Sequence, residues 1–354
     1  MRKNLLNIII IITILMAVAV NVHIRKGPGE AAPGQPILRE GNSFNTKDIA
    51  PDVKGLGGPI EMLVGLDKEG NIEDVEVLSH NETSQYAAGI SEPEFLDQFK
   101  GKGSEDDFIV GEDIDGVTHA TISSSAVAMT LKTSLERINR PGHVSKKKAP
   151  FNLNLDFYLT VLIITFLLMA FYLKANWLRY TGLFISVLYF GFWKANFISM
   201  TSLGGVFLWN LPDFRSNIAW YVFIFSGLIL TFLIGAFYCT YMCPFGGLQI
   251  FLNKIFKFNV EITPQVEKSL RKIKYILLWI LTVLVLTLNN ANIVNYEPFA
   301  TVFLRRGSVA AWLILAIVLI LSLFHHRPFC SWFCAAGAFL DMLSKAGRKV
   351  FKKR

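Results

Sequence analysis

All four cysteines of the chain fall into two short motifs. Cys239 and Cys243 form one C-x-x-x-C motif, and Cys330 and Cys334 form another 91 residues later. At positions i and i+4 of an α-helix, both thiols of a pair would share one face. Two such pairs brought together supply four sulfurs, the donor set of an iron–sulfur cluster or of a Cys₄ zinc site. The alternatives are thiols that simply pack as small apolar groups and disulfides, which a reducing cytosol disfavours.

The cysteine motifs belong to a longer tandem repeat. The run from Cys239 to Gly246 aligns with the run from Cys330 to Gly337, and Arg215 falls on Arg306 at the same spacing. Pro244 is expected to start the helix after the first motif, where its missing N–H costs nothing. Parallel repeats in membrane proteins place a shared site at their interface, which favours one four-sulfur centre. His325 and His326 precede the second motif; we interpret them as an interfacial pair, with haem or metal binding as the alternative.

The composition points to a membrane protein that carries one soluble domain. The 354 residues are 52% hydrophobic and only 18% charged, which excludes a disordered chain, and four cysteines are too few for a disulfide-rich scaffold. Residues 27–140 contain 9 basic and 21 acidic residues, whereas the rest contains 26 basic and 6 acidic ones. Because the basic residues flank long apolar runs, they predict contact with membrane lipid and not with nucleic acid.

The apolar runs predict six transmembrane helices. The first, Leu5–Val22, follows Arg2 and Lys3 and is interpreted as a retained anchor rather than a cleaved signal peptide. Five further runs have roughly the 20 residues that a bilayer requires, namely 155–173, 178–198, 217–238, 273–290 and 308–324. The lysines and arginines are concentrated on one side, which places both termini in the cytoplasm and residues 27–150 outside the cell membrane. Glu297 is then expected on a solvated outer loop.

The soluble region has the pattern of an α+β domain. Gly57–Asn71 is typical of a strand that ends in a turn, and Ile72–Leu78 of its hairpin partner. Phe95–Phe99 and 121–138 have helical spacing. Thr121 opens a polar run just before the second of these helices, and a helix N-terminus favours a bound phosphate. The alternative interpretation is that Thr121 merely caps the helix.

These elements predict an α+β exoplasmic domain joined to an all-α membrane domain. The boundaries follow from the apolar runs and the charges: residues 1–26 are the anchor, 27–150 the exoplasmic domain and linker, 151–344 a five-helix membrane domain with both cysteine motifs, and 345–354 a basic cytoplasmic tail.

Four runs in the soluble region resemble the FMN-binding domain family of the ion-pumping NADH:quinone and ferredoxin:NAD oxidoreductases and of NosR-type membrane proteins. They are Gly57–Asn71, His80–Thr83, Phe95–Lys102 and Asp115–Thr121. The last is similar to the flavinylation motif, which implies FMN joined to Thr121 by a phosphodiester bond and an ApbE-type FMN transferase as maturation partner. His119 stands where the family usually has Gly. The resemblance further implies a cofactor site made of Asp115, Thr118, His119, Ala120, Ser123, Glu82 and Thr83.

The membrane half resembles the short NosR-type proteins encoded beside reductive dehalogenases, although Ala335 follows the second motif where Pro is usual. This resemblance implies an electron-transfer component and not a stand-alone enzyme. Electrons would pass from the quinone pool, as menaquinol, or from a cytoplasmic donor through covalent FMN to an exoplasmic reductase such as a reductive dehalogenase. The rival hypothesis is a redox-sensing regulatory or maturation protein for a partner reductase; a transporter is a weaker third.

Overall fold

The computed structural model describes residues 42–139, 154–256, 258, 260 and 262–351. The chain divides into two compact units. The first contains the N-terminal part of the chain together with Gly204–Asn217 and Leu284–Ile293, and the second contains the remainder. The predicted anchor at residues 1–26 and most of the linker after residue 139 lie outside the described residues.

The first unit is built on a three-stranded antiparallel sheet in the order β1-β2-β3. Its strands are β1 (Ser43–Asn45), β2 (Glu61–Leu66) and β3 (Ile72–Ser79). Along β2, every second residue is buried, because successive side chains of a strand point to opposite faces. Gly70 turns the β2–β3 hairpin with a φ of +87°, which a glycine adopts without strain. The predicted hairpin is confirmed, with its first strand starting at Glu61.

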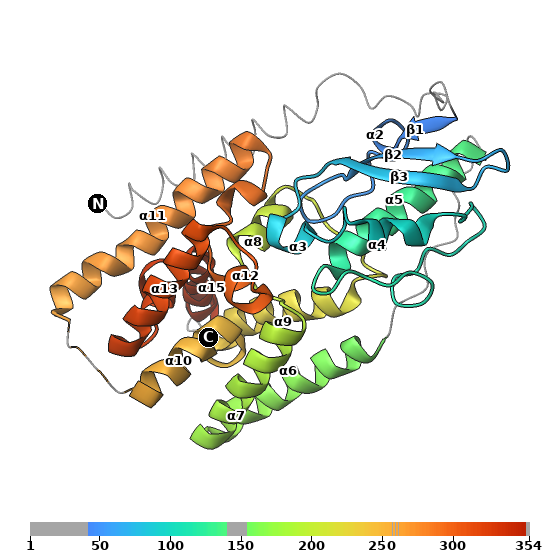
Figure 1. Ribbon diagram of the computed structural model, residues 1–354. Helices are drawn as coiled ribbons and strands as arrows, with labels where there is room; N and C mark the ends of the chain where they lie inside the picture. The colour runs from blue at the N-terminus through green and yellow to red at the C-terminus, as the bar shows by residue number, and fades with distance from the viewer. Residues whose placement is uncertain (1–41, 140–153, 257, 259, 261, 352–354) are drawn as a thin grey trace. The chain divides into compact units, whose positions relative to one another are not determined.

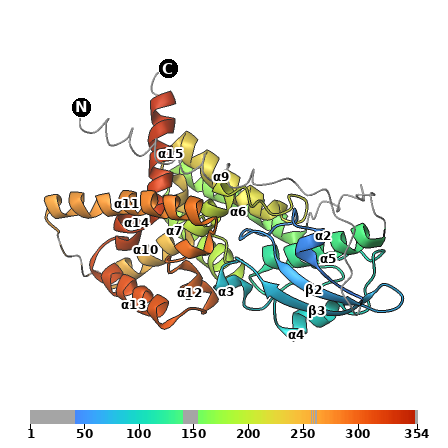
Figure 2. The same cartoon turned by 90° about the horizontal axis from the view of Figure 1, so that it is seen from above.

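Short helices and one long helix complete this domain. They are α2 (Thr46–Ile49), α3 (Ser84–Ala87), α4 (Pro93–Leu96), the 3₁₀ turn η1 (Asp97–Phe99) and α5 (Thr121–Asn139). Helix α5 runs along the sheet (Figures 1 and 2) and closes a core that includes Phe44, Met62, Val64, Val127 and Leu131. The predicted helices at 95–99 and 121–138 are therefore present, and the N-terminus of α5 is held on a packed scaffold.

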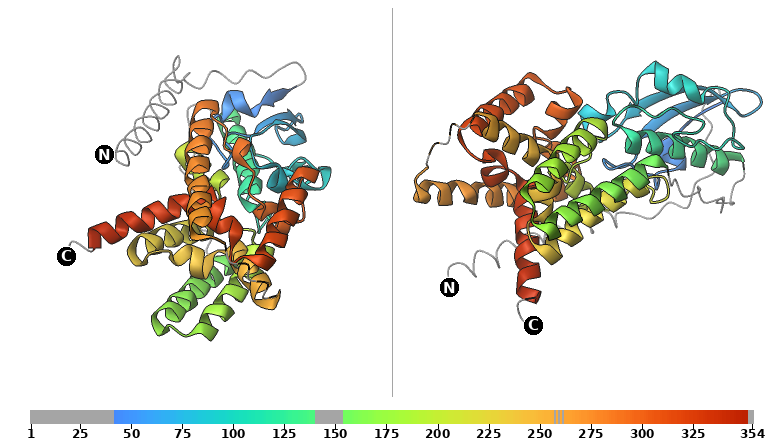
Figure 3. Two further views of the ribbon diagram at one scale, coloured as in Figure 1. Left: turned by 90° about the vertical axis from the view of Figure 1, so that its left-hand side faces the viewer. Right: turned by 90° about the horizontal axis from the view of Figure 1, so that it is seen from below.

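The rest of the described chain is helical, which confirms the coarse fold prediction. These helices run from green to red in Figure 3. The elements are α6 (Leu155–Leu173), α7 (Asn176–Ser186), the π-helix η2 (Val187–Trp193), α8 (Met200–Phe207), α9 (Ile218–Ile234), the π-helix η3 (Tyr238–Met242), α10 (Pro244–Phe256), α11 (Pro264–Leu288), η4 (Asn292–Val294), α12 (Phe299–Leu304), α13 (Val309–Phe324), α14 (Pro328–Trp332) and α15 (Ala335–Phe351).

The prediction of six transmembrane helices is not supported. Within the described residues, one helix, α6, is both long and apolar enough to cross a bilayer, while α9 and α13 are apolar but have 17 and 16 residues. The run predicted at 178–198 is shared by α7 and the π-helix η2, and residues 195–199 are not helical. Helix α11 has 25 residues, but its first turns carry charges such as Glu267 and Arg271. The first predicted span lies outside the described residues.

The two sequence repeats exchange helices. Helix α10 of the first repeat packs against α13 of the second, and α15 of the second packs against α9 of the first. The end of α15 projects from the helices it starts among (Figure 2). Because the cysteine motifs join α9 to α10 and α13 to α15, this exchange brings the two motifs together.

Candidate functional site

The N-terminus of α5 presents an exposed hydroxyl beside unpaired helix amides. The carbonyl of Ala120 accepts the first helical bond, from Ser124 N at 2.8 Å, so Ala120 occupies the N-cap position. The amides of residues 121–123 precede any helical acceptor. Thr121 is the first helical residue and is exposed. The interpretation of Thr121 as the cap is therefore wrong, and its hydroxyl lies where the helix end favours a phosphate.

The turn before α5 explains why glycine suits the position of His119. His119 has a φ of +66°, in the left-handed region that glycine enters freely and other residues enter at a cost. The turn is fixed by two bonds, from Ala120 N to the Val117 carbonyl at 2.9 Å and from Val117 N to Ser124 Oγ at 3.0 Å. Thr118 lies exposed within it. Upstream, Asp115 is tied through its backbone to the amide of Gln98, at 2.7 and 3.2 Å.

Glu82 is a buried carboxylate that connects two loops to α5. Only 4% of its surface is exposed. Its Oε1 accepts a bond from Gly57 N at 2.6 Å, and its Oε2 accepts one from Ser123 Oγ at 2.7 Å. A Cβ on Gly55 would lie 2.3 Å from Oε1, so this loop packs against the carboxylate through glycine. Burial raises the pKa of Glu82 above its ordinary 4.5, and its two hydrogen bonds partly oppose that rise.

Two residues of the expected cofactor site meet at the start of α5. Glu82 and Ser123 are in direct contact, and Ser123 is two positions beyond Thr121. Thr83 has a different role: its carbonyl accepts bonds from Tyr86 N and Ala87 N, both at 2.9 Å, which start α3. Glu82 therefore holds the α5 terminus in place from inside the domain.

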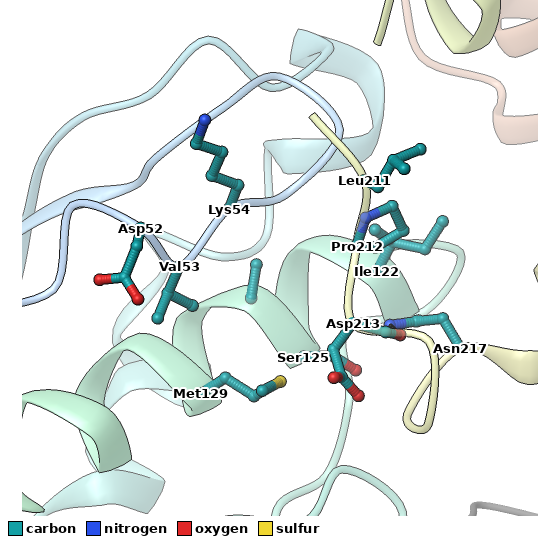
Figure 4. Close-up of a pocket in the computed structure, with 11 residues that line it drawn as sticks. Asp52, Val53, Lys54, Ile122, Ser125, Met129, Leu211, Pro212, Asp213 and Asn217 are labelled. Carbon is teal, nitrogen blue, oxygen red and sulfur yellow. Dashed lines mark hydrogen bonds between the residues drawn. The ribbon is translucent and has the colours of Figure 1, made fainter. Parts of the chain in front are cut away.

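A pocket of about 190 Å³ opens along α5 (Figure 4). Ser125 and Met129 line it, one and two turns beyond Thr121 on the same helix face. The other lining residues are Asp52, Val53, Lys54, Ile122, Ala126, Leu211, Pro212, Asp213 and Asn217, all in the first compact unit. Residues 211–217 were not predicted to line this pocket, because no local pattern signals that so distant a segment meets α5.

Each cysteine motif wraps a π-type turn and is not one face of an α-helix. Cys243 N bonds the carbonyl of Tyr238 at 2.8 Å, and Cys334 N bonds that of Phe329 at 2.9 Å; both bonds span five residues. The expectation of a continuous helix with i, i+4 thiols is therefore wrong. The second cysteine of each motif immediately precedes the next helix, α10 or α15, and Pro244 starts α10 as predicted.

The two helix N-termini that follow the motifs each donate to a sulfur. Gly246 N lies 3.4 Å from Cys243 Sγ, and Gly337 N lies 3.1 Å from Cys334 Sγ, at equivalent places in the two repeats. Both of these cysteines are buried. Amides at a helix N-terminus favour the thiolate, which is the metal-binding form of cysteine.

Two polar side chains that the sequence analysis missed join the motifs. Arg327 donates through Nη2 to the Cys239 carbonyl and also bonds the Cys330 side chain. Gln249 donates from Nε2 to Cys330 Sγ at 3.2 Å, and its Oε1 accepts from Phe329 N at 3.2 Å. No local pattern marks either residue, since Arg327 follows His325 and His326, and Gln249 lies near Asn253 and Lys254.

The donor set fits an iron–sulfur cluster better than a single metal ion. Within the described part of the chain, no three His, Cys, Asp or Glu side chains are close enough to hold one ion. A tetrahedral zinc site needs every sulfur at about 2.3 Å from the same ion, whereas each cysteine of a 4Fe-4S cluster binds a different iron. A cation at Arg327 and N–H donors to sulfur suit a negatively charged cluster.

Two further residues of this unit, His325 and Glu297, have defined partners. His325 stacks on Trp332 with ring centroids 4.7 Å apart. Glu297, expected to be solvated, is only 5% exposed; its Oε2 accepts a bond of 2.7 Å from Met200 N. The expectation was wrong because the carboxylate folds back onto the N-terminus of α8, where the helix dipole favours a negative charge.

Comparison with known proteins identifies both regions. Residues 55–136 match the FMN-binding domain family, and residues 216–263 and 308–354 match the 4Fe-4S binding domain family. The chain is 33% identical over 105 residues to one component of the proton-translocating ferredoxin:NAD(+) oxidoreductase complex of Clostridium ljungdahlii, covering 28% of this chain and 57% of the relative.

A second relative is also a component of an oxidoreductase complex. The chain is 29% identical over 124 residues to one component of the ion-translocating oxidoreductase complex of Vibrio vulnificus, covering 32% of this chain and 58% of the relative. The chain thus spans little more than half the length of either. No solved structure matches it. The protein therefore contains an FMN-binding domain and a 4Fe-4S binding domain.

Proposed function

We propose that this protein is a membrane-bound electron carrier that exchanges electrons between a covalent FMN on Thr121 and an iron–sulfur cluster held by Cys239, Cys243, Cys330 and Cys334. The observation that carries the proposal is that one chain joins an FMN-binding domain to a duplicated 4Fe-4S binding domain. Flavins and iron–sulfur clusters both supply electron-transfer chemistry, while the protein positions and tunes them.

Thr121 is the proposed attachment point because it combines exposure with phosphate-binding backbone. Its hydroxyl is accessible to an FMN transferase, and the amides of residues 121–123 are available to phosphate oxygens. Glu82, through Ser123, fixes this helix end from the buried side. The pocket along Ser125 and Met129 continues on the same face, so it offers a surface for part of the flavin ring. Its volume is below that of most ligand pockets, which leaves the rest of the ring accessible for electron exchange.

Attachment to the cell membrane is the proposed setting. Helix α6 has the length and composition to span a bilayer, and many large apolar side chains on the other helices are exposed, among them Trp177, Ile317 and Val309. The excess of basic residues outside the acidic domain favours an exoplasmic flavin and a cytoplasmic C-terminus. Quinol or a cytoplasmic protein would donate electrons, and an exoplasmic reductase would receive them. The named relatives are components of oxidoreductase complexes, which supports a protein partner.

The test is electron exchange within the full-length protein. The protein is matured with an FMN transferase, purified in detergent without oxygen, and illuminated with EDTA, which photoreduces a bound flavin. Illumination should bleach both flavin and cluster absorbance in the wild type and in the control Thr133→Ala. Thr121→Ala should show neither change, yet dithionite should still reduce its cluster. Flavin bleaching without any cluster reduction in the wild type would contradict exchange between the two centres.

A further inference from the structure

Arg327 is a cation that bridges the two cysteine motifs. It precedes Pro328 with a φ of +59°, a left-handed conformation that arginine adopts at a cost. Its Nη2 donates to the carbonyl of Cys239, in the first motif, and its side chain bonds Cys330, in the second. A Cβ on Gly246 would lie 3.2 Å from Nη2, so a glycine at that position leaves room for the guanidinium.

The guanidinium has no carboxylate partner among the residues that the structure describes. None of the ion pairs found there includes Arg327, and its Nε is buried without a hydrogen-bond partner. A partly buried cation requires negative charge nearby to offset its desolvation. The charges available to it are those of the four cysteine sulfurs and of whatever they bind.

The donors to sulfur break the symmetry of the repeat. Arg327 and Gln249 correspond, at the spacing of 91, to Ala236 and Leu340, which have no polar side chain. Both donors act on Cys330, whereas the amides of Gly246 and Gly337 serve the two second cysteines alike. We call Cys239, Cys243, Cys330 and Cys334 together the four-cysteine site. Its side near Cys330 is therefore more positive than the symmetric repeat alone would make it.

We propose that Arg327 is a tuning residue of the four-cysteine site: it stabilises the additional negative charge of the reduced state and so raises the reduction potential of the site. The inference rests on the proposed function. In the step concerned, one electron leaves a reduced flavin, which is thereby oxidised, and enters the site, where the guanidinium offsets the added charge. Charge near a cluster and hydrogen bonds to its sulfurs are the main means by which proteins set its potential. Gln249 adds a second, uncharged donor to the same sulfur.

The test is a redox titration of full-length variants, followed by visible absorbance, with iron and sulfide measured on each sample. Arg327→Gln removes the charge and Arg327→Lys retains it. Gln249→Leu installs the residue of the other repeat. Arg348→Gln is the matched control, because it removes an exposed cation from α15 of the same unit, where solvent and salt screen the effect.

We expect Arg327→Gln to retain iron and to weaken reduction at least tenfold, a midpoint about 59 mV more negative for one electron. Arg327→Lys and Gln249→Leu should shift in the same direction by less, and Arg348→Gln by less again. If Arg327→Gln does not retain iron, Arg327→Lys and Gln249→Leu decide the matter, and midpoints equal to that of Arg348→Gln would overturn the inference. Equal midpoints in Arg327→Gln and Arg348→Gln would overturn it too. Wild-type protein without iron would instead refute the proposed function.

Discussion

The FMN-binding domain (residues 42–139, called the flavin domain below) buries its large apolar side chains, whereas the helices from residue 155 onward expose many of theirs. Between residues 42 and 139, all of which the structure describes, Leu78 is the one large apolar side chain that is exposed. The helices from 155 onward expose many, including Leu162 at 64% and Val309 at 78%. The first pattern is that of a domain folded in water by burying apolar surface. The second pattern leaves apolar surface uncovered, which agrees with the proposed membrane setting.

The two proposed cofactor sites also differ in how far apart in the sequence their residues lie. The proposed flavin site is mostly local: the residues around Thr121 lie on one turn and one helix start, although Glu82 reaches them from another loop and residues 211–217 line the adjoining pocket. The proposed four-cysteine site is non-local, because its two motifs come together through the exchange of α10 and α15 between repeats. We therefore expect damage at either site to leave the other intact, and the following experiments test that independence.

The largest effect is expected from the cysteines. Cys239→Ser or Cys334→Ser should remove nearly all iron and sulfide from the purified protein, because each cysteine would bind a separate iron, while covalent flavin should remain at its wild-type amount. Ser331→Ala, next to Cys330, is the control and should retain iron. Normal iron content in the cysteine variants would show that the thiols merely pack.

Glu82→Ala should destabilise the flavin domain by about 2 to 4 kcal/mol, because it leaves the donors of Gly57 and Ser123 buried and unpaired. Hydrogen exchange of the full-length protein should show faster exchange in α5 and unchanged exchange in α9 and α13. Glu94→Ala, at an exposed position of α4, should change stability by less than about 0.5 kcal/mol. Unaltered α5 protection in Glu82→Ala would mean that the carboxylate does not hold the helix end.

The same carboxylate should give the flavin domain a distinctive pH dependence. Burial raises the pKa of Glu82 above 4.5 in the folded state, so the folded domain binds its proton more tightly than the unfolded chain. The contribution to stability is then present below pH 4.5 and is lost as pH rises through the raised pKa. Subtracting the stability of Glu82→Gln from that of the wild type at each pH isolates this slope. A difference that stays flat or increases with pH contradicts the assigned burial.

His119→Gly should have the smallest effect. It relieves the left-handed strain at φ +66°, but glycine also gives the unfolded chain more conformational entropy. The net gain in folding stability is therefore up to about 1 kcal/mol. The melting temperature of the flavin domain should rise slightly, with flavin loading retained. Thr118 lies in the same turn without that strain, so the control Thr118→Gly should lower the melting temperature. A lower melting temperature for His119→Gly would show that the imidazole contributes more than the backbone strain costs.

The sequence predicted what depends on local pattern. The strand-and-turn pattern of residues 57–71, the alternation over 72–78 and the helical spacing after Thr121 predicted the hairpin and the long helix of the flavin domain, and the repeated cysteines indicated a shared four-sulfur site. It could not predict contacts that depend on tertiary packing. Arg327, Gln249 and Glu297 carry no local signal of their partners, which lie 80 to 97 positions away in the sequence. The span prediction at 155–173 matches α6, whereas the run predicted at 178–198 is shared by α7 and the π-helix η2, a change of helix type that hydropathy does not show.

The most direct test of the central claim is the intact mass of the full-length protein matured with an FMN transferase, measured beside Thr121→Ala and Thr133→Ala. We expect the wild type and Thr133→Ala to carry the mass of one phosphodiester-linked FMN and to fluoresce in a denaturing gel, and Thr121→Ala to show the bare polypeptide mass. A wild-type chain without added mass, or a Thr121→Ala chain that still carries the flavin, would contradict the account.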